Sequence, residues 1–127
     1  MKPQRIPEPS VLPPLIFDIE TDGLLPTMTK IHCGVVYDSL LNITHRFEPE
    51  DIPDMVDMLQ RTEQPLCGHN IINFDIPAIQ KLYPEFQPKV LPIDTKIWSQ
   101  LVTPDLLNLS YTKCRQWLRK VPSDLLD

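Results

Sequence analysis

The segment LIFDIETDGL, residues 15–24, places two carboxylates at the end of an apolar run. The run predicts a strand over 15–20 that is buried on both faces, and Gly23 predicts the turn that follows it. Residues two apart in a strand point to the same side, so Asp18 and Glu20 bring two negative charges together. Neighbouring carboxylates repel each other, and a divalent cation with oxygen ligands is the usual compensation.

The same residues fit an alternative, in which Glu20 and Asp22 are loop acids that cap the next turn. A D-x-E pattern occurs often by chance, so one motif does not decide between a cation site and a pair of loop acids. The arrangement of the other acidic residues therefore matters.

The rest of the chain predicts an α/β fold. Apolar and β-branched content predicts strands over five segments: 15–20, 30–38, 43–48, 65–69 and 90–93. Helical spacing of apolar residues predicts four helices: 53–61, 76–82, 96–102 and 111–120. The first three strands form an antiparallel meander, and the last two lie parallel to the first. The result is a mixed five-stranded sheet with flanking helices, in which strand 15–20 is central.

Composition sets the organisation and limits the classes of partner. Five prolines in residues 1–14 predict a flexible, extended arm before a core over 15–103 and a C-terminal helix and tail over 104–127. A net charge of −5 argues against a broad basic nucleic-acid surface, although catalytic carboxylates contribute to that acidity. No apolar run reaches transmembrane length, and no secretory leader precedes the core, so we expect a cytoplasmic protein that does not enter a membrane.

The three cysteines, Cys33, Cys67 and Cys114, are odd in number and lack C-x-x-C spacing. This pattern is typical of reduced thiols in a cytosolic protein. It does not indicate a disulfide framework or a zinc site.

Further acids follow the neighbouring predicted strands. Asp75 and Asp94 each come directly after one of these strands. Ligands of open α/β sheets gather outside the carboxyl ends of the strands, so both acids can converge with Asp18 and Glu20. Converging acids without a basic cluster indicate two divalent ions, the arrangement used for in-line phosphoryl transfer. The alternative, that Asp75 and Asp94 are N-caps of the following helices, stays open.

Three blocks of sequence, FDIETDGL, GHNIINFDIPAI and PIDTKIWSQLV, resemble the 3′–5′ exonuclease domain of the DEDD superfamily, which has an RNase H-like fold. The first matches the D-x-E motif, and the second matches N-x3-[FY]-D through Asn70, Phe74 and Asp75. The third, Asp94-Thr95, matches a common feature of the next strand. The segment KIHCGVVYD also resembles the proofreading domain of podovirus-type family A DNA polymerases. The resemblance covers residues 15–103.

The resemblance implies a two-metal site for Mg²⁺ or Mn²⁺, held by Asp18, Glu20 and Asp75. It also implies contacts to the terminal nucleotides from four residues: Thr21, Leu24, Asn70 and Phe74. The implied reaction is hydrolysis of the last phosphodiester at the 3′ end of single-stranded DNA, which releases a nucleoside monophosphate.

The chain departs from the family pattern at the third motif, Tyr-x3-Asp or His-x4-Asp, which supplies the last metal ligand. Tyr111 is followed at the matching position by Arg115, and a guanidinium does not bind a cation. Asp124 and Asp127 have no Tyr or His partner at the right spacing. We therefore expect an exonuclease fold that is incomplete at the C-terminus and has little or no activity alone.

Three hypotheses follow. The favoured one is part of a proofreading exonuclease of a phage-type DNA polymerase, completed by a polymerase fragment or another replication protein. The second is a non-catalytic module that binds a DNA end or a replication protein. The third is a small nuclease whose missing ligand comes from a partner subunit. DNA and RNA are not distinguished, because no residue is a clear reader of the 2′-hydroxyl.

Overall fold

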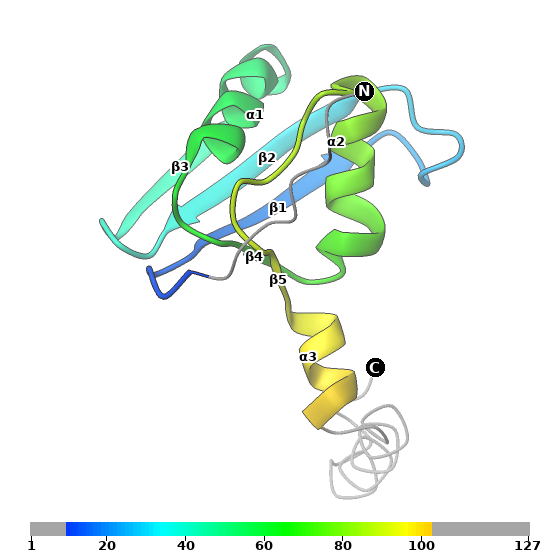
Figure 1. Cartoon of the computed structure of the whole chain (residues 1–127). Coiled ribbons are helices and arrows are strands. Elements are labelled where there is room, and N and C mark those ends of the chain that lie inside the picture. Colours follow the sequence, from blue (N-terminus) through cyan, green and yellow to red (C-terminus); the bar gives the residue numbers. More distant parts are fainter. Residues whose placement is uncertain (1–9, 103–127) are drawn as a thin grey trace, which may run out of the picture. The chain divides into compact units, whose positions relative to one another are not determined.

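The computed structural model describes residues 10–102 of the chain, which divides into two compact units, residues 1–95 and 96–127. The strands are β1 Leu15–Thr21, β2 Ile31–Asp38, β3 Ile43–Phe47, β4 Leu66–Gly68 and β5 Ile93–Asp94 (Figure 1). The helices are a 3₁₀ turn Pro49–Asp51, α1 Ile52–Arg61, a π-helical turn Ile71–Asp75, α2 Ile76–Leu82 and α3 Thr95–Val102. The predicted helix 111–120, Cys114, the tail and the first nine residues of the arm lie outside the described residues.

The five strands form one sheet in the order β3-β2-β1-β4-β5. Strands β1, β2 and β3 pair antiparallel, whereas β4 lies parallel to β1 and β5 parallel to β4. The predicted α/β fold, with a mixed sheet and a central first strand, is confirmed. The predicted bounds of the last strand, 90–93, are wrong, because β5 covers Ile93–Asp94. Pro92 has no backbone N–H and cannot donate a hydrogen bond to the neighbouring strand.

Strand β1 is buried on one face only, so the predicted burial on both faces is wrong. Leu15, Phe17 and Ile19 are buried, and the alternate residues from Ile16 onward are exposed. Helices α1 and α2 lie over the same face of the sheet (Figure 1). An apolar run alone does not show how many faces of a strand have a covering layer.

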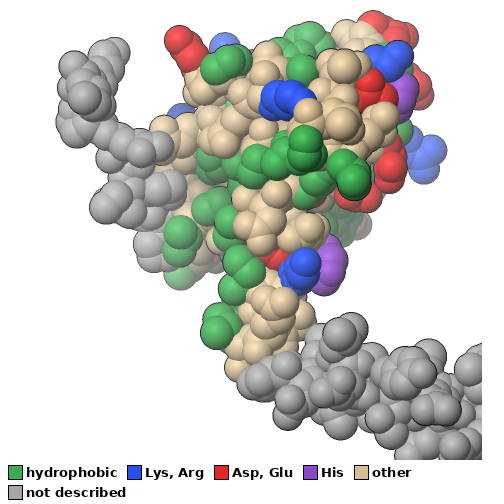
Figure 2. Space-filling view, turned by 90° about the vertical axis from the view of Figure 1, so that its right-hand side faces the viewer, with side chains coloured by type: hydrophobic (Ala, Val, Ile, Leu, Met, Phe, Trp, Pro, Cys, Tyr) green, Lys and Arg blue, Asp and Glu red, His purple; other side chains and the backbone are tan. Residues whose placement is uncertain are grey.

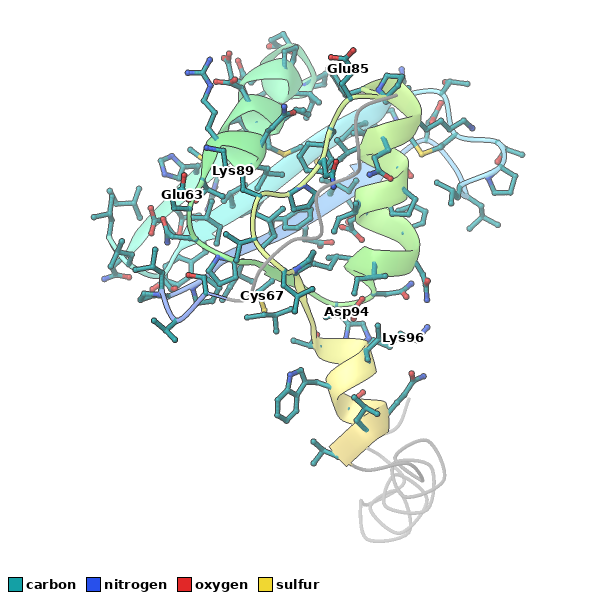
Figure 3. All side chains as sticks on the ribbon, in the orientation of Figure 1. Glu63, Cys67, Glu85, Lys89, Asp94 and Lys96 are labelled. Atoms are coloured by element: carbon teal, nitrogen blue, oxygen red, sulfur yellow. The ribbon has the colours of Figure 1, made fainter. Side chains whose placement is uncertain are left out.

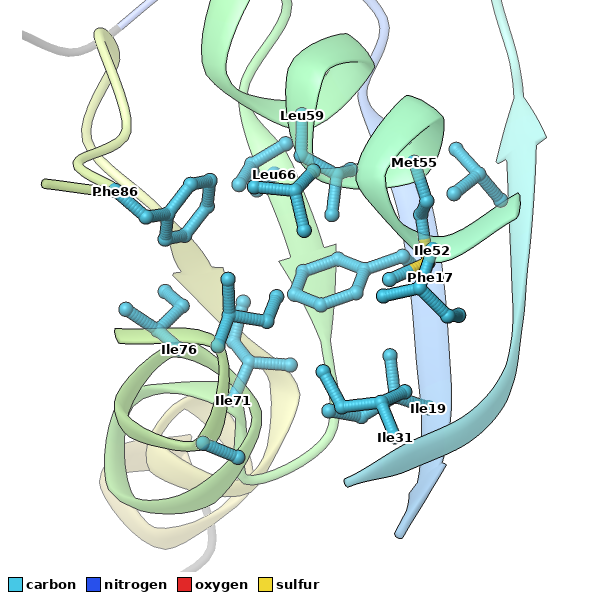
Figure 4. Close-up of a cluster of buried hydrophobic side chains, with 14 of the residues drawn as sticks. Phe17, Ile19, Ile31, Ile52, Met55, Leu59, Leu66, Ile71, Ile76 and Phe86 are labelled. Carbon is cyan, nitrogen blue, oxygen red and sulfur yellow. The ribbon is translucent and has the colours of Figure 1, made fainter. Parts of the chain in front are cut away.

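The core lies between that face and the two helices. Phe17 sits among side chains from α1, β4 and the π-turn (Figure 4). Helix α1 contributes four buried residues at helical spacing: Ile52, Met55, Val56 and Leu59. Met55 is fully buried, and its flexible side chain fills the core beneath α1. The packed layer fixes the backbone of β1, on whose opposite side Asp18 and Glu20 lie.

The end of the proline-rich arm contacts the sheet. The carbonyl of Pro14 accepts hydrogen bonds from the backbone N–H of Ser39 (3.2 Å) and from its hydroxyl (2.6 Å). The side-chain amide of Gln64 donates to the carbonyl of Pro13 at 2.9 Å and to the buried carboxylate of Asp38 at 3.1 Å. These bonds set the position at which the chain enters β1.

Candidate active site

Asp18 and Glu20 lie on the exposed face of the central strand. Side chains alternate between the two faces of β1, so Phe17 and Ile19 point into the core and both carboxylates lie on the other face. The register with β2 shifts between Glu20 and Thr21, and such a bulge re-aims side chains at a strand end. Two neighbouring carboxylates are therefore held on a rigid strand, where β1 leaves the sheet.

Asp75 reaches the same strand from the start of α2. Pairing of β1 with the short strand β4 ends at Ile16 and Cys67, so β1 continues past its neighbour. There, the backbone N–H of Ile19 donates a hydrogen bond to the carboxylate of Asp75. Asp75 is only 4% exposed. Its carboxylate thus lies against the backbone of β1 at the residue between Asp18 and Glu20.

The charge on Asp75 is disfavoured in this position. Burial, and then the negative charge of Asp18, raise the pKa of Asp75 to about 6. The charge of Asp94 also raises the pKa of Asp75, by a smaller amount. The hydrogen bond from the N–H of Ile19 lowers this pKa. Asp18, Asp75 and Asp94 therefore lie close enough for their charges to interact.

The donor set fits a hard divalent cation. All three predicted ligands, Asp18, Glu20 and Asp75, offer carboxylate oxygens, which Mg²⁺ and Mn²⁺ prefer. A cation would also relieve the repulsion between Asp18 and Asp75. Across residues 10–102, however, no three His, Cys, Asp or Glu side chains stand close enough to form a metal site by themselves. The described residues thus supply ligands of the right chemistry, but these ligands do not form a complete metal site by themselves.

We predict an unusual pH dependence of stability. In the folded chain Asp75 has a pKa of about 6, whereas in the unfolded chain it has its ordinary pKa of 3.8. Between about pH 4 and 6 the folded chain therefore keeps a proton on Asp75 that the unfolded chain loses. Stability without divalent ions therefore falls as pH rises through this window, with a decrease in Tm on the order of 5 °C between pH 4 and 7.

Thermal unfolding in EDTA measures this effect. Asp75→Asn keeps the shape of the side chain but does not titrate, so its Tm should change less over the same window. An identical pH profile for the wild type and Asp75→Asn would contradict the assignment of the raised pKa.

Asp94 shapes the segment that carries Asp75. Its carboxylate accepts hydrogen bonds from the backbone N–H of Asn70 at 2.9 Å and of Ile72 at 3.0 Å. Asn70 has a left-handed φ of 61°, so the chain turns sharply after β4. The next residues form the π-turn, and Asp75 already has helical dihedral angles without a side-chain capping bond. The N-cap interpretation of Asp75 is therefore wrong.

The four residues predicted to contact nucleotides are placed differently. Leu24 is 76% exposed on the loop after β1. The Oδ1 atom of Asn70 is buried and has no hydrogen-bond partner among the described residues, so it is open to a donor. The hydroxyl of Thr21 donates to the carbonyl of Gly23 at 2.7 Å, and Phe74 packs against the core. Leu24 is therefore exposed and the Asn70 acceptor is buried, and contacts of all four residues with nucleotides stay predictions.

Lys81 was not among the predicted site residues, although its ammonium binds backbone carbonyls of the loop that presents Leu24. No sequence signal marks this role, because a lysine in the last turn of a helix is ordinary. The role of the Ile19 N–H was not predicted either. This donor is unpaired in the sheet because the neighbouring strand is short, and no local sequence pattern indicates that.

Figure 2 shows the molecule from the side of α2 and the loop after β1, where basic side chains are scattered among acidic and apolar ones. Figure 3 shows Cys67 and Asp94 near the ends of β4 and β5, where burial, and then the charge of Asp94, raise the pKa of the Cys67 thiol. Both described cysteines, Cys33 and Cys67, are free thiols.

The described helices carry no membrane-spanning segment, since none is both long and apolar enough to cross a bilayer.

Comparison with known proteins agrees with this fold. Residues 15–120 match the model of the RNase H superfamily. Over 101 residues the chain is 35% identical to a DNA-directed DNA polymerase of Enterobacteria phage T3. It is 33% identical over 101 residues to the corresponding polymerase of Escherichia phage T7. The matched segment covers 72% of this chain but only 14% of each polymerase. By its sheet order and by this match, the chain belongs to the RNase H superfamily.

Proposed function

We propose that this chain forms the front part of a DEDD-type 3′–5′ exonuclease that proofreads for a phage-type DNA polymerase. The observation that carries the proposal is the position of the Asp75 carboxylate against the backbone of Ile19, between Asp18 and Glu20. Similarity to two DNA-directed DNA polymerases supports DNA as the class of substrate. In this proposal the substrate is a single-stranded 3′ end, and the partner is a polymerase fragment. The protein would then act in the cytoplasm of a bacterial or phage-infected cell.

Each group has a distinct task in this proposal. Asp18, Glu20 and Asp75 would hold Mg²⁺ or Mn²⁺, and a bound ion would supply an activated water and stabilise the leaving oxygen. Asp18 would be shared between the two ions, as the resemblance implies, because its charge acts on Asp75 and it neighbours Glu20 on β1. Leu24 packs against the terminal base, and the free acceptor of Asn70 receives a donor from the DNA. The third-motif ligand and its water-orienting partner come from another segment.

The second candidate is a binding module without catalysis. It is favoured by one observation, that the described carboxylates do not form a closed metal site. A module of this kind binds either a DNA end or a replication protein. If it binds a DNA end, both candidates require recognition of a free 3′ end and differ only in hydrolysis.

Recognition of a free 3′ end gives the first test. With Ca²⁺ in place of Mg²⁺ to limit hydrolysis, the chain should bind a linear oligonucleotide more tightly than a circular one of the same sequence. Leu24→Ala should weaken binding of the linear form on the order of 10-fold, because an apolar contact with a base is lost. Fluorescence anisotropy measures both affinities.

The matched control is Leu41→Ala. Leu41 is also exposed, at 63%, but it lies in the turn between β2 and β3. Its replacement should leave binding unchanged. Equal affinities for the linear and circular forms would contradict recognition of an end.

A further inference from the structure

The loop that joins β1 to β2, residues 22–30, is held in a single compact turn. The backbone N–H groups of Thr27 and Met28 both donate to the carbonyl of Leu24, at 3.0 Å and 2.8 Å. Met28 is 1% exposed and anchors the turn in the core, whereas Leu24 is 76% exposed. The loop therefore presents one large apolar side chain to solvent from a fixed backbone.

Asp22 closes the base of this loop. Its carboxylate accepts hydrogen bonds from the backbone N–H of Thr29 at 2.7 Å and of Lys30 at 3.1 Å. The hydroxyl of Thr29 donates to the second oxygen. These bonds hold the pKa of Asp22 well below its usual range, so the carboxylate stays charged and keeps accepting. The predicted role of Asp22 as a loop acid agrees with these contacts.

Lys81 holds the other side of the loop. Its ammonium donates to the carbonyls of Leu25 and Met28, each at 2.9 Å, and to that of Pro26 at 3.3 Å. An ammonium has three donors, and these three carbonyls can engage all of them. A surface lysine ordinarily stays hydrated or pairs with an acid, as Lys89 does with Glu63 at 3.2 Å (Figure 3). Lys81 is instead bound to the backbone of a sequence-distant loop.

We propose that Lys81 and Asp22 are positioning residues that hold the Leu24 loop ready to receive the terminal base of a DNA strand. This inference rests on the proposed function. A loop ordered before binding loses less conformational freedom when the base packs against it, so the affinity is higher. Lys81 lies near the end of α2 and Asp75 directly before its start. The same helix thus fixes the Leu24 loop and one carboxylate of the candidate site relative to each other.

A double-mutant cycle separates this role from direct contact with phosphate. Lys81→Met should weaken binding of the linear oligonucleotide in Ca²⁺ on the order of 5-fold. It should have no further effect in the Leu24→Ala variant, because Lys81 acts through Leu24. The dependence of log K on log salt should keep its slope. Lys89→Met, which removes a lysine paired at the surface, serves as the matched control and should bind as the wild type does.

Two outcomes overturn the proposal through binding. If the salt slope becomes shallower by about 0.7 and the Lys81→Met effect persists in Leu24→Ala, Lys81 contacts a phosphate instead. If Lys81→Met binds the linear oligonucleotide with the affinity of the wild type, the hydrogen bonds of Lys81 to the loop do not contribute to DNA binding.

Hydrogen exchange gives a readout that does not depend on DNA. In Lys81→Met the amides of Thr27 and Met28 should exchange faster, while the Tm stays close to that of the wild type. Unchanged exchange at these amides would show that Lys81 does not hold the loop, whatever the binding result. If exchange accelerates but the wild type does not prefer a free end, the proposed function fails. Lys81 would then hold the loop without any role in binding a DNA end, and the proposed positioning role would be rejected together with the proposed function.

Discussion

Addition of a segment that carries the third exonuclease motif, fused to this chain or supplied in trans, is expected to raise 3′–5′ trimming at least on the order of 10²- to 10³-fold. The reason is that a metal ligand and a water-orienting side chain act on the transition state, and preorganised groups of this kind each contribute about that factor. The measurement is release of nucleoside monophosphate from a 3′-labelled single strand with Mg²⁺. The chain alone should release little or none.

Variants in the completed protein assign the activity to the site. Asp18→Ala and Asp75→Ala should each abolish the gained trimming, because both carboxylates hold the catalytic ions. Asp57→Ala is the matched control, since Asp57 is an exposed acid of α1 paired only with Arg61 of the same helix. Strong trimming by the unsupplemented chain would show that another of its residues completes the site. An inert completed protein would favour the non-catalytic binding module.

Asp18→Ala is further expected to weaken Mn²⁺ binding by at least about 100-fold. Asp18 is the carboxylate that repels Asp75 and also neighbours Glu20, so its loss removes the ligand shared between the two ions. Isothermal titration of the chain with Mn²⁺ measures the change, and Asp57→Ala should bind as the wild type does.

Acid should weaken Mn²⁺ binding in the same titration. Asp75 must lose a proton to become a ligand, and its pKa is raised to about 6. The affinity of the wild type should therefore decline as pH falls below about 6. Unchanged Mn²⁺ binding in Asp18→Ala would place the ions elsewhere.

The sheet was predictable because its signals are local. The β-branched content of the second and third strands and the short spacings between them indicate a meander, and helices before the last two strands indicate parallel pairing. The covering of β1 was not predictable. Whether Ile16 faces solvent depends on which side α1 and α2 pack, and this is decided by the assembled core.

The proximity of Asp75 and Asp94 to Asp18 was predictable from the sequence, but the contacts that place Asp75 and Asp94 were not. The spacing of Asp18 and Glu20 on one strand follows from the period of two, and the position of Asp75 after a neighbouring strand follows from the rule for strand ends. The length of β4, however, decides that Ile19 has a free N–H for Asp75. The length of β4 is set by strand pairing and cannot be read from the local sequence. The turn at Asn70 depends on Asp94, which is distant in sequence, so it cannot be read locally either.

The most direct test of the candidate site is the anomalous scattering of Mn²⁺ in crystals of the completed protein soaked with the ion and a nucleoside monophosphate. We expect anomalous peaks within bonding distance, about 2.2 Å, of carboxylate oxygens of Asp18, Glu20 and Asp75, with Asp18 bound to two ions. In Asp18→Ala crystals these peaks should disappear. Mn²⁺ peaks only at other acids, or peaks that persist unchanged in Asp18→Ala, would contradict the assignment of these three residues as the metal site.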